Sequence, residues 1–402
     1  MQRYIFLLSL FLSLNTYSQV VTYEDSLNAN LVRKTSPTVI SGYGEAKYQY
    51  YKEEKTATTN VTRAIIFLGH KFSDKIQFFS EWELENAKVA NGGSGEFSLE
   101  QFLLKYNINK DWYLISGLFV PRIGIINENH LSTTFNGNDR PYLESTIIPA
   151  TWREIGVGLY GNSARIQGLN YSVALVNGLD ASKFKNGTGI RDGRAEGSYG
   201  SSRNIAVTAA ILYYYNSFRI QVSTYYGGSS GLSNRLSDSL QIATGAFALP
   251  INVSEGNILY KKNGLCIKAM LAHTFINDAD KINTVYANNT PRQMLGYYTE
   301  LGYDFLNRKY HGEKSLTIFV RYENINMDYE TATNGIENGP NTQKHVVAGI
   351  QFAPLRGVAI KLDYHHATTG NINPALVVNP FPQMPQYYTS RNFINLGFGY
   401  SF

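Results

Sequence analysis

Residues 394–402 read INLGFGYSF, and this stretch decides the fold of the chain. Ile394, Leu396, Phe398, Tyr400 and Phe402 stand at every second position, with asparagine, glycine or serine between them. Successive residues of a β-strand point to opposite faces of a sheet. The stretch therefore predicts a strand that is apolar on one face and polar on the other.

The same alternation recurs along the chain. It is found in residues 76–85, 218–224, 316–323 and 358–365. The wall of a transmembrane barrel has this pattern, because one face of each strand meets lipid and the other meets the lumen. After residue 18, no apolar run is long enough for a membrane helix, which needs about 20 residues. Lipid cannot satisfy an open sheet edge, so any sheet that crosses the membrane must close.

The connections between the alternating segments are short and long in turn. Together they predict an all-β fold over residues 39–402: a 16-stranded antiparallel transmembrane β-barrel with long extracellular loops and short periplasmic turns. The short turns are expected near residues 73–74, 109–110, 162–163, 216–217, 262–263, 307–314 and 354–357. The long loops are expected at residues 52–60, 88–96, 122–150, 178–202, 228–253, 277–292, 328–341 and 369–388.

Composition narrows the class of protein. The chain has 402 residues, of which 30 are tyrosine and 21 phenylalanine, and charged residues make up 17%. A mean hydropathy of −0.24 does not suit a helical membrane protein. The formal net charge of +5 is small for this length and argues against a nucleic-acid partner. The single cysteine, Cys266, excludes an internal disulfide.

The N-terminus predicts export. Residues 1–18 combine Arg3, an apolar run over 4–14 and a small residue, Ser18, and this combination indicates a cleavable signal peptide. Residues 19–38 form a polar N-terminal segment. We expect the mature protein to lie in the lipid of a bacterial outer membrane. The terminal Phe402 resembles the signature that the barrel-assembly machinery recognises.

The longest predicted loop is the third one, at residues 122–150. Around it the chain reads GLFVPRIG from residue 117, NENH from residue 127, DRP from residue 139, IIP from residue 147 and TWREIGVG from residue 151. This order of elements resembles the phosphate-selective porin O and P family, most closely over residues 117–161. The resemblance implies homotrimeric diffusion pores for small ions or hydrophilic solutes, in which the third loop folds into the barrel and narrows it.

The family resemblance also implies anions, and phosphate in particular, as the transported class. Arginine suits such a ligand, because its planar fork matches the oxygens of phosphate. Arg122, Arg140 and Arg153 are the candidate residues of the constriction. Other residues expected to line the pore are Lys47, Glu81, Glu83, Arg219, Lys268, Arg321, Lys361 and Arg391. Counted over the strands that can be phased, six basic residues and eight acidic residues face inward, so the wall is mixed in charge.

Other functions have weaker support. Ser229 stands in a GGSSG stretch that matches the motif of serine hydrolases, but it lies in a glycine-serine loop rather than between a strand and a helix. His365 and His366 are neighbours on a strand and point to opposite faces, and no histidine has metal-ligand spacing. We therefore expect no enzyme activity, metal or cofactor. The alternative to a porin is a plugged, non-conducting barrel that serves as an accessory subunit of an outer-membrane complex.

Overall fold

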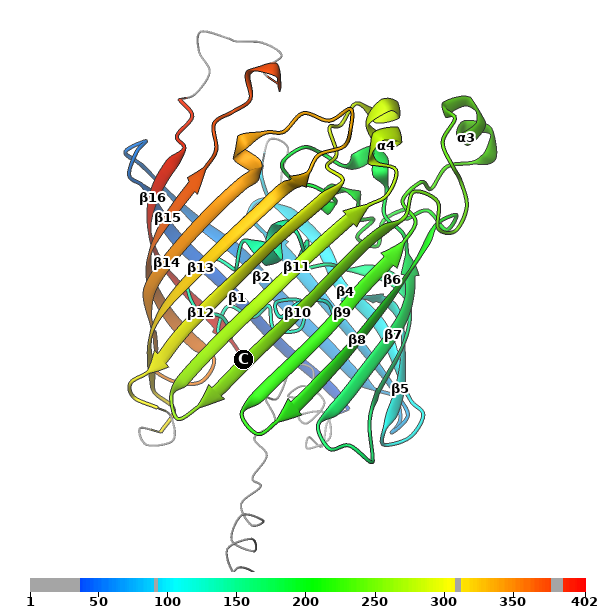
Figure 1. Cartoon of the computed structure of the whole chain (residues 1–402). Coiled ribbons are helices and arrows are strands. Elements are labelled where there is room, and N and C mark those ends of the chain that lie inside the picture. Colours follow the sequence, from blue (N-terminus) through cyan, green and yellow to red (C-terminus); the bar gives the residue numbers. More distant parts are fainter. Residues whose placement is uncertain (1–36, 90–92, 308–311, 377–385) are drawn as a thin grey trace, which may run out of the picture.

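A computed structural model describes residues 37–89, 93–307, 312–376 and 386–402 of the chain. Its 16 strands form one closed antiparallel barrel in which each strand pairs with its sequence neighbours, as predicted (Figure 1). The strands are β1 (Thr38–Tyr51), β2 (Thr56–Lys71), β3 (Ile76–Glu85), β4 (Glu96–Asn107), β5 (Trp112–Phe119), β6 (Glu154–Asn162), β7 (Leu169–Asn177), β8 (Ile205–Tyr215), β9 (Phe218–Gly227), β10 (Ile251–Lys262), β11 (Leu265–Ile276), β12 (Gln293–Asp304), β13 (Ser315–Glu330), β14 (Thr342–Ala353), β15 (Val358–Thr369) and β16 (Ser390–Ser401).

The barrel closes through the C-terminal strand, which contains residues 394–401. β16 pairs with β1 from Tyr43 opposite Ser401 to Tyr51 opposite Phe393. Its side chains alternate as predicted, because Leu396 is 50% exposed on the outer wall while Asn395 is 1% exposed in the lumen. The outer face of this strand is therefore apolar, and it is the face that lipid would cover.

Short turns gather at one end of the barrel and long loops at the other (Figure 1). The long-loop end carries α3 (Asn234–Leu240) and α4 (Ala279–Tyr286). The helix α3 lies in the fifth long loop. Single turns of 3-10 helix lie in other loops: η1 (Ala181–Lys183), η2 (Arg191–Gly193), η3 (Gly339–Asn341) and η4 (Pro374–Leu376). Within the described residues, no helix is both long enough and apolar enough to span a membrane.

Several predicted loop boundaries differ from those of the structure, most of all in the first long loop. The first long loop, expected at 52–60, is only residues 52–55, because β2 already begins at Thr56 and pairs with Tyr51. The segment Thr56–Asn60 has no large apolar side chain on either face, so hydropathy could not indicate it, although threonine is well suited to strands. The fifth loop ends earlier than residue 253, because β10 begins at Ile251. The predicted signal peptide at 1–18 and almost all of the polar segment at 19–38 lie outside the described residues.

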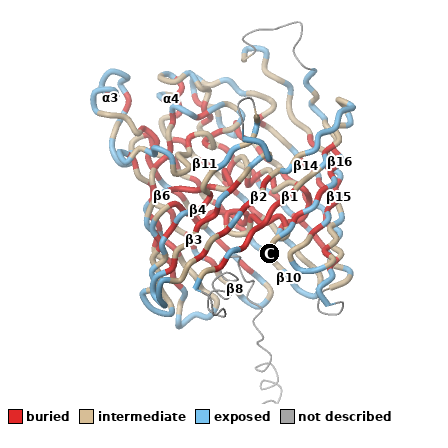
Figure 2. The backbone as a smooth tube through the Cα atoms, turned by 180° about the vertical axis from the view of Figure 1, so that it is seen from behind, coloured by how far each residue is buried: buried red, intermediate tan, exposed pale blue. Residues whose placement is uncertain are grey.

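The interior of the barrel is filled by its third loop. Loop 3, defined here as residues 120–153, joins β5 to β6 and contains the short helix α2 (Leu143–Thr146). Figure 2 shows buried backbone crossing the inside of the barrel as well as its wall. Ile123, Leu143, Ile147 and Trp152 of this loop are all fully buried. The loop therefore lies in the lumen rather than over the mouth.

Candidate functional site

The docking of loop 3 begins with apolar contacts. Its buried isoleucines and Leu143 join a cluster with Met270, Met294 and Tyr298, which point inward from β11 and β12. Gly296 of β12 makes room for α2, since a Cβ there would stand 2.6 Å from the Leu143 side chain. Burial of large apolar side chains contributes about 1.5–3 kcal/mol each, so this cluster holds the loop firmly to one side of the wall.

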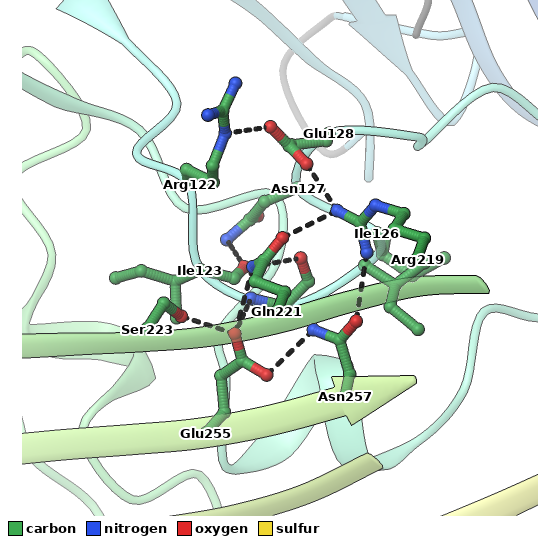
Figure 3. A network of polar contacts seen from close by, with 12 residues as sticks. Arg122, Ile123, Ile126, Asn127, Glu128, Arg219, Gln221, Ser223, Glu255 and Asn257 are labelled. Carbon is green, nitrogen blue, oxygen red and sulfur yellow. Dashed lines mark hydrogen bonds and ion pairs between the residues drawn. The ribbon is translucent and has the colours of Figure 1, made fainter. Parts of the chain in front are cut away.

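A charged network fixes the start of the loop to β9 and β10 (Figure 3). The Glu128 carboxylate accepts hydrogen bonds from Arg122 Nε and from Arg219 Nη2. On β10, Glu255 accepts hydrogen bonds from the Gly124 backbone N–H at 3.2 Å and from Gln221 Nε2 at 3.0 Å. Arg219 and Glu255 are buried, so removal of a partner of either would leave an uncompensated charge, which costs about 3–5 kcal/mol.

The pKa of Glu128 reflects this pairing. Burial alone would raise that pKa, but the attraction of Arg122 and Arg219 outweighs burial and lowers it below the usual value. Glu144 in α2 shows the opposite balance. Burial raises its pKa to about 7, although its Oε2 accepts hydrogen bonds from the Ile125 and Ile126 N–H groups at 2.7 Å. The loop thus holds one firmly ionised carboxylate and one that titrates near neutrality.

The middle of the loop is bound by the far side of the barrel. Lys361 Nζ of β15 donates to the Phe135 and Gly137 carbonyl oxygens at 3.0 and 2.8 Å. Arg321 of β13 donates to the Asn136 carbonyl oxygen at 3.3 Å. In a closed ring of 16 strands, β13 lies eight positions from β5, where the loop starts. Loop 3 therefore crosses the whole lumen.

Glycines on the closing strand allow the loop to approach it. A Cβ on Gly399 would stand 2.1 Å from Ser132 Oγ, and one on Gly397 would stand 2.2 Å from Asn138 Oδ1. Only glycine permits such a close approach of the backbone. These two glycines were predicted only as the polar face of β16, and their structural role is to accept loop 3.

One predicted arginine faces an open cavity. Arg122 lines a polar cavity of about 270 Å³ near the short turns, with Lys105, Lys110 and Asp111 among the other lining residues. Figure 3 shows the Nη end of Arg122 pointing away from Glu128. Of its nitrogens, only Nε hydrogen bonds to another described residue. The two Nη atoms are therefore available to a ligand in the cavity.

The other two predicted arginines lie apart from this cavity and bond within the protein. Arg140 donates from Nη1 to Thr151 Oγ1 at 2.9 Å and from Nη2 to the His130 carbonyl oxygen at 3.4 Å. Arg153 is 8% exposed and pairs with Glu83 and Glu196, each at 3.4 Å. The structure thus does not bring the three arginines together on one ligand, and their part in a constriction stays a prediction.

The other basic residues predicted to line the pore have partners within the protein. Lys47 pairs with Asp139 of loop 3 at 2.5 Å, and Lys268 pairs with Glu300 at 2.9 Å. Arg391 lies toward the long-loop end and pairs with Glu54 at 2.6 Å. Arg219, Arg321 and Lys361 bind loop 3, as described above. Contact of these residues with a passing ion stays a prediction.

Several interior residues were missed by the sequence reasoning. Lys105 could have been found, because the apolar alternation of Phe102, Leu104 and Tyr106 on β4 places it on the inner face. Lys110 lies in a turn and carries no such signal. Glu100 and His130 come together with Glu81 only because loop 3 folds inward, and no spacing in the chain indicates this.

The hydrolase motif does not form a catalytic site in this fold. Ser229 is fully buried, and its hydroxyl donates to the Leu249 carbonyl oxygen at 2.8 Å. Its Oγ is therefore not presented to a substrate. His365 contacts His345 across the sheet, with 3.0 Å between Nδ1 of His345 and Nε2 of His365, whereas His366 hydrogen bonds to Asn392. The two neighbouring histidines thus point apart, as expected.

Comparison with known proteins supports the same fold. The chain is 30% identical over 340 residues, 81% of its length, to an uncharacterized protein of Aquifex aeolicus (strain VF5), of which the match covers 74%. It also resembles the outer membrane channel DcaP of Acinetobacter baumannii, with 11% identity, a TM-score of 0.53 and coverage of 91% of this chain and 97% of that one.

The third comparison is with an anion-selective porin from Comamonas acidovorans, at 10% identity and a TM-score of 0.52, covering 91% of this chain and 99% of that one. At this identity the likeness shows the fold alone. No protein-family model matches the chain, so the phosphate-selective family stays a hypothesis. The chain belongs to the same family as the Aquifex aeolicus protein, and its 16-stranded barrel is that of the outer-membrane porins.

Proposed function

We propose that this protein is an outer-membrane diffusion channel for small hydrophilic solutes, with loop 3 as its constriction. The observation that carries the proposal is the path of the loop. It leaves the wall at β5, crosses the lumen and is bound by Arg219 on one side and by Arg321 and Lys361 on the far side. A loop held at both sides sets a fixed width, and a channel selects by the width and charge of its narrowest part.

We also propose that the channel prefers anions, with phosphate as the candidate class. The support for this preference comes from the residues around one cavity. The cavity beside loop 3 is lined by three basic residues, Arg122, Lys105 and Lys110, against the single acid Asp111. The free Nη fork of Arg122 suits an oxyanion, since two parallel N–H groups match two oxygens. The Comamonas acidovorans porin, which has the same fold, is an anion-selective one.

A barrel that does not conduct and acts as an accessory subunit is the second candidate. It is favoured by the apolar cluster within the lumen, where Ile123, Leu143 and Ile147 are fully buried. A loop packed this densely would serve as a plug if no continuous water path remained beside it.

The deciding experiment is single-channel recording of the refolded mature protein in a planar bilayer, with reversal potential measured across a salt gradient. Stepwise conductance with an anion-favouring reversal potential, reduced by added phosphate, is expected. A cation-favouring potential would keep the channel and remove the anion preference. Absence of conductance from protein that shows the β-sheet circular dichroism of a folded barrel would support the accessory role.

The cellular context is part of the same proposal. We infer export through the signal peptide at 1–18, assembly through the terminal Phe402 and a homotrimeric state, following the resemblance described above. N-terminal sequencing of the mature protein tests cleavage after Ser18. Chemical cross-linking in native outer membranes tests the trimer.

A further inference from the structure

We propose that Glu81, Glu100 and His130 form a binding site for one divalent transition-metal ion, which fastens loop 3 to the inner wall. Glu81 comes from β3, Glu100 from β4 and His130 from the middle of loop 3. One ligand atom from each lies within 4.8 Å of the others. The proposal does not depend on whether the barrel conducts.

The distances suit a shared ion better than a direct contact. His130 Nε2 lies 3.8 Å from Glu81 Oε2 and 3.7 Å from Glu100 Oε2. Both distances are too long for hydrogen bonds. Tetrahedral zinc binds nitrogen and oxygen ligands at about 2.0–2.2 Å, which places two such ligands about 3.3–3.6 Å apart. An ion would therefore require His130 and each glutamate to approach each other by only a few tenths of an ångström, while the ligand oxygens of the two glutamates already lie within 4.8 Å of each other.

The imidazole nitrogen that faces the two carboxylates has no hydrogen-bond partner. The His130 side chain is 5% exposed, and both glutamate side chains are fully buried. Its Nε2 makes no hydrogen bond to any described group, and neither does Glu81 Oε1. A buried polar atom without a partner costs about 1–3 kcal/mol, so its persistence indicates a ligand that would satisfy it.

Supporting hydrogen bonds orient all three groups toward the same point. Nδ1 of His130 lies 3.3 Å from the Asn127 carbonyl oxygen, which favours a proton on Nδ1 and leaves the lone pair of Nε2 free. Tyr43 donates its hydroxyl to Glu100 Oε2 at 3.0 Å, and Gln101 Nε2 donates to Glu81 Oε2 at 2.7 Å. Ligands in metal sites are held by partners of this kind.

The donor set selects the kind of ion. One imidazole and two carboxylates suit zinc or manganese, whereas soft ions such as Cu(I) prefer sulfur ligands. Two positive charges on the ion would balance the two buried carboxylates. The rival explanation is a metal-free cluster in which a protonated His130 lies between the two carboxylates.

Zinc binding to the detergent-purified full barrel, stripped with a chelator, separates the two explanations. We expect one zinc per chain by calorimetry and elemental analysis, with a rise in the thermal unfolding temperature. His130→Ala should weaken this binding at least tenfold and abolish the rise in unfolding temperature. His273→Ala is the matched control, because His273 lies on β11 and hydrogen bonds to Gln293. The His273→Ala variant should retain both the zinc binding and the rise in unfolding temperature.

A second variant guards against misfolding. Glu81→Gln keeps the shape of the side chain and removes one anionic ligand, and it should also weaken zinc binding at least tenfold. The fold of each variant is checked by the heat-dependent mobility shift of barrels on gels. Cobalt provides an independent readout, since visible absorption of a tetrahedral ion should appear in wild type and be lost in both variants. Absence of zinc binding by the folded wild type, or equal binding by His130→Ala, would overturn the proposal.

Discussion

The proposed anion preference is most directly tested at Arg122. Glu128 is shared by Arg122 and Arg219, so the three side chains together carry one net positive charge. Arg122→Gln removes that charge and keeps a shorter polar side chain. A sphere of 270 Å³ has a radius of about 4 Å. An anion that accepts a hydrogen bond of about 2.9 Å from an Nη atom lies about 4 Å from the central carbon of the guanidinium. Two unit charges at 4 Å attract by about 1 kcal/mol in water and about 4 kcal/mol at an effective dielectric constant of 20.

An attraction of 1 kcal/mol already corresponds to about a fivefold change in occupancy, because 1.4 kcal/mol corresponds to about tenfold. We therefore expect Arg122→Gln to reduce the chloride-over-potassium permeability ratio at least about fivefold. The Debye length of about 8 Å at physiological salt exceeds the radius of the cavity, so screening does not remove the effect. The assay is the reversal potential in a planar bilayer under a salt gradient.

Two controls separate charge from structure. Arg122→Lys keeps the charge and should keep most of the anion preference, although it loses the planar fork. Arg235→Gln removes the same charge from an exposed position on α3, away from the cavity, and should leave the ratio unchanged. An unchanged ratio in Arg122→Gln, with the folded barrel intact, would refute the role of Arg122 in selecting ions.

Three further predictions concern the loop and the wall. Gly399→Val should displace loop 3 and lower the free energy of unfolding by about 1–3 kcal/mol, because the valine side chain would overlap Ser132. Gly256→Val is the control in thermal unfolding, since a Cβ at Gly256 meets only one atom, at 4.0 Å. Equal effects of the two substitutions would contradict the reasoning. The pKa of Glu144 is raised to about 7 from 4.5, so its contribution to loop docking is complete below about pH 4.5 and is lost as pH rises through about 7. Hydrogen exchange at the Ile125 and Ile126 amides, corrected for the intrinsic rate, should show weaker protection at pH 8 than at pH 5 in wild type. The Glu144→Gln variant should show no such trend. Stronger protection of wild type at pH 8 would be inconsistent with this assignment. Leu396→Arg on the lipid face should lower the free energy of unfolding, measured with denaturant in bilayers, by about 2–4 kcal/mol, whereas Leu396→Phe should leave it unchanged. Equal unfolding midpoints of the two variants would place Leu396 outside the lipid zone.

The wall of the barrel could be predicted because its pattern is imposed by lipid. Lipid demands apolar side chains at every second position, so Leu396 and Phe398 indicate the outer face without knowledge of their neighbours. Where β2 extends through Thr56–Asn60, neither face carries a large apolar side chain, and the prediction of a loop there was wrong. That part of the strand is defined by its hydrogen bonds to β1, and the hydropathy pattern does not indicate such pairing.

The path of loop 3 could not be predicted in the same way. Its position depends on contacts between residues far apart in sequence, such as Lys361 with Gly137 and Arg219 with Glu128. The sequence indicates only that the loop is long and contains glycine and proline. For the same reason Glu81, Glu100 and His130 showed no ligand spacing, although they meet in the fold.

Counting inward charges is consequently a poor guide to the selectivity of a barrel of this kind. The wall appeared mixed, with six basic and eight acidic positions, but most of those charges neutralise one another or bind the loop. Arg321 is paired with both Glu300 and Glu323, and Lys268 is paired with Glu300, so none of these presents a full charge to a passing ion. The field that an ion meets is set by groups whose donors remain open to water. At the cavity beside loop 3 these include the Nη atoms of Arg122, and for that reason one substitution there should outweigh several at the paired positions.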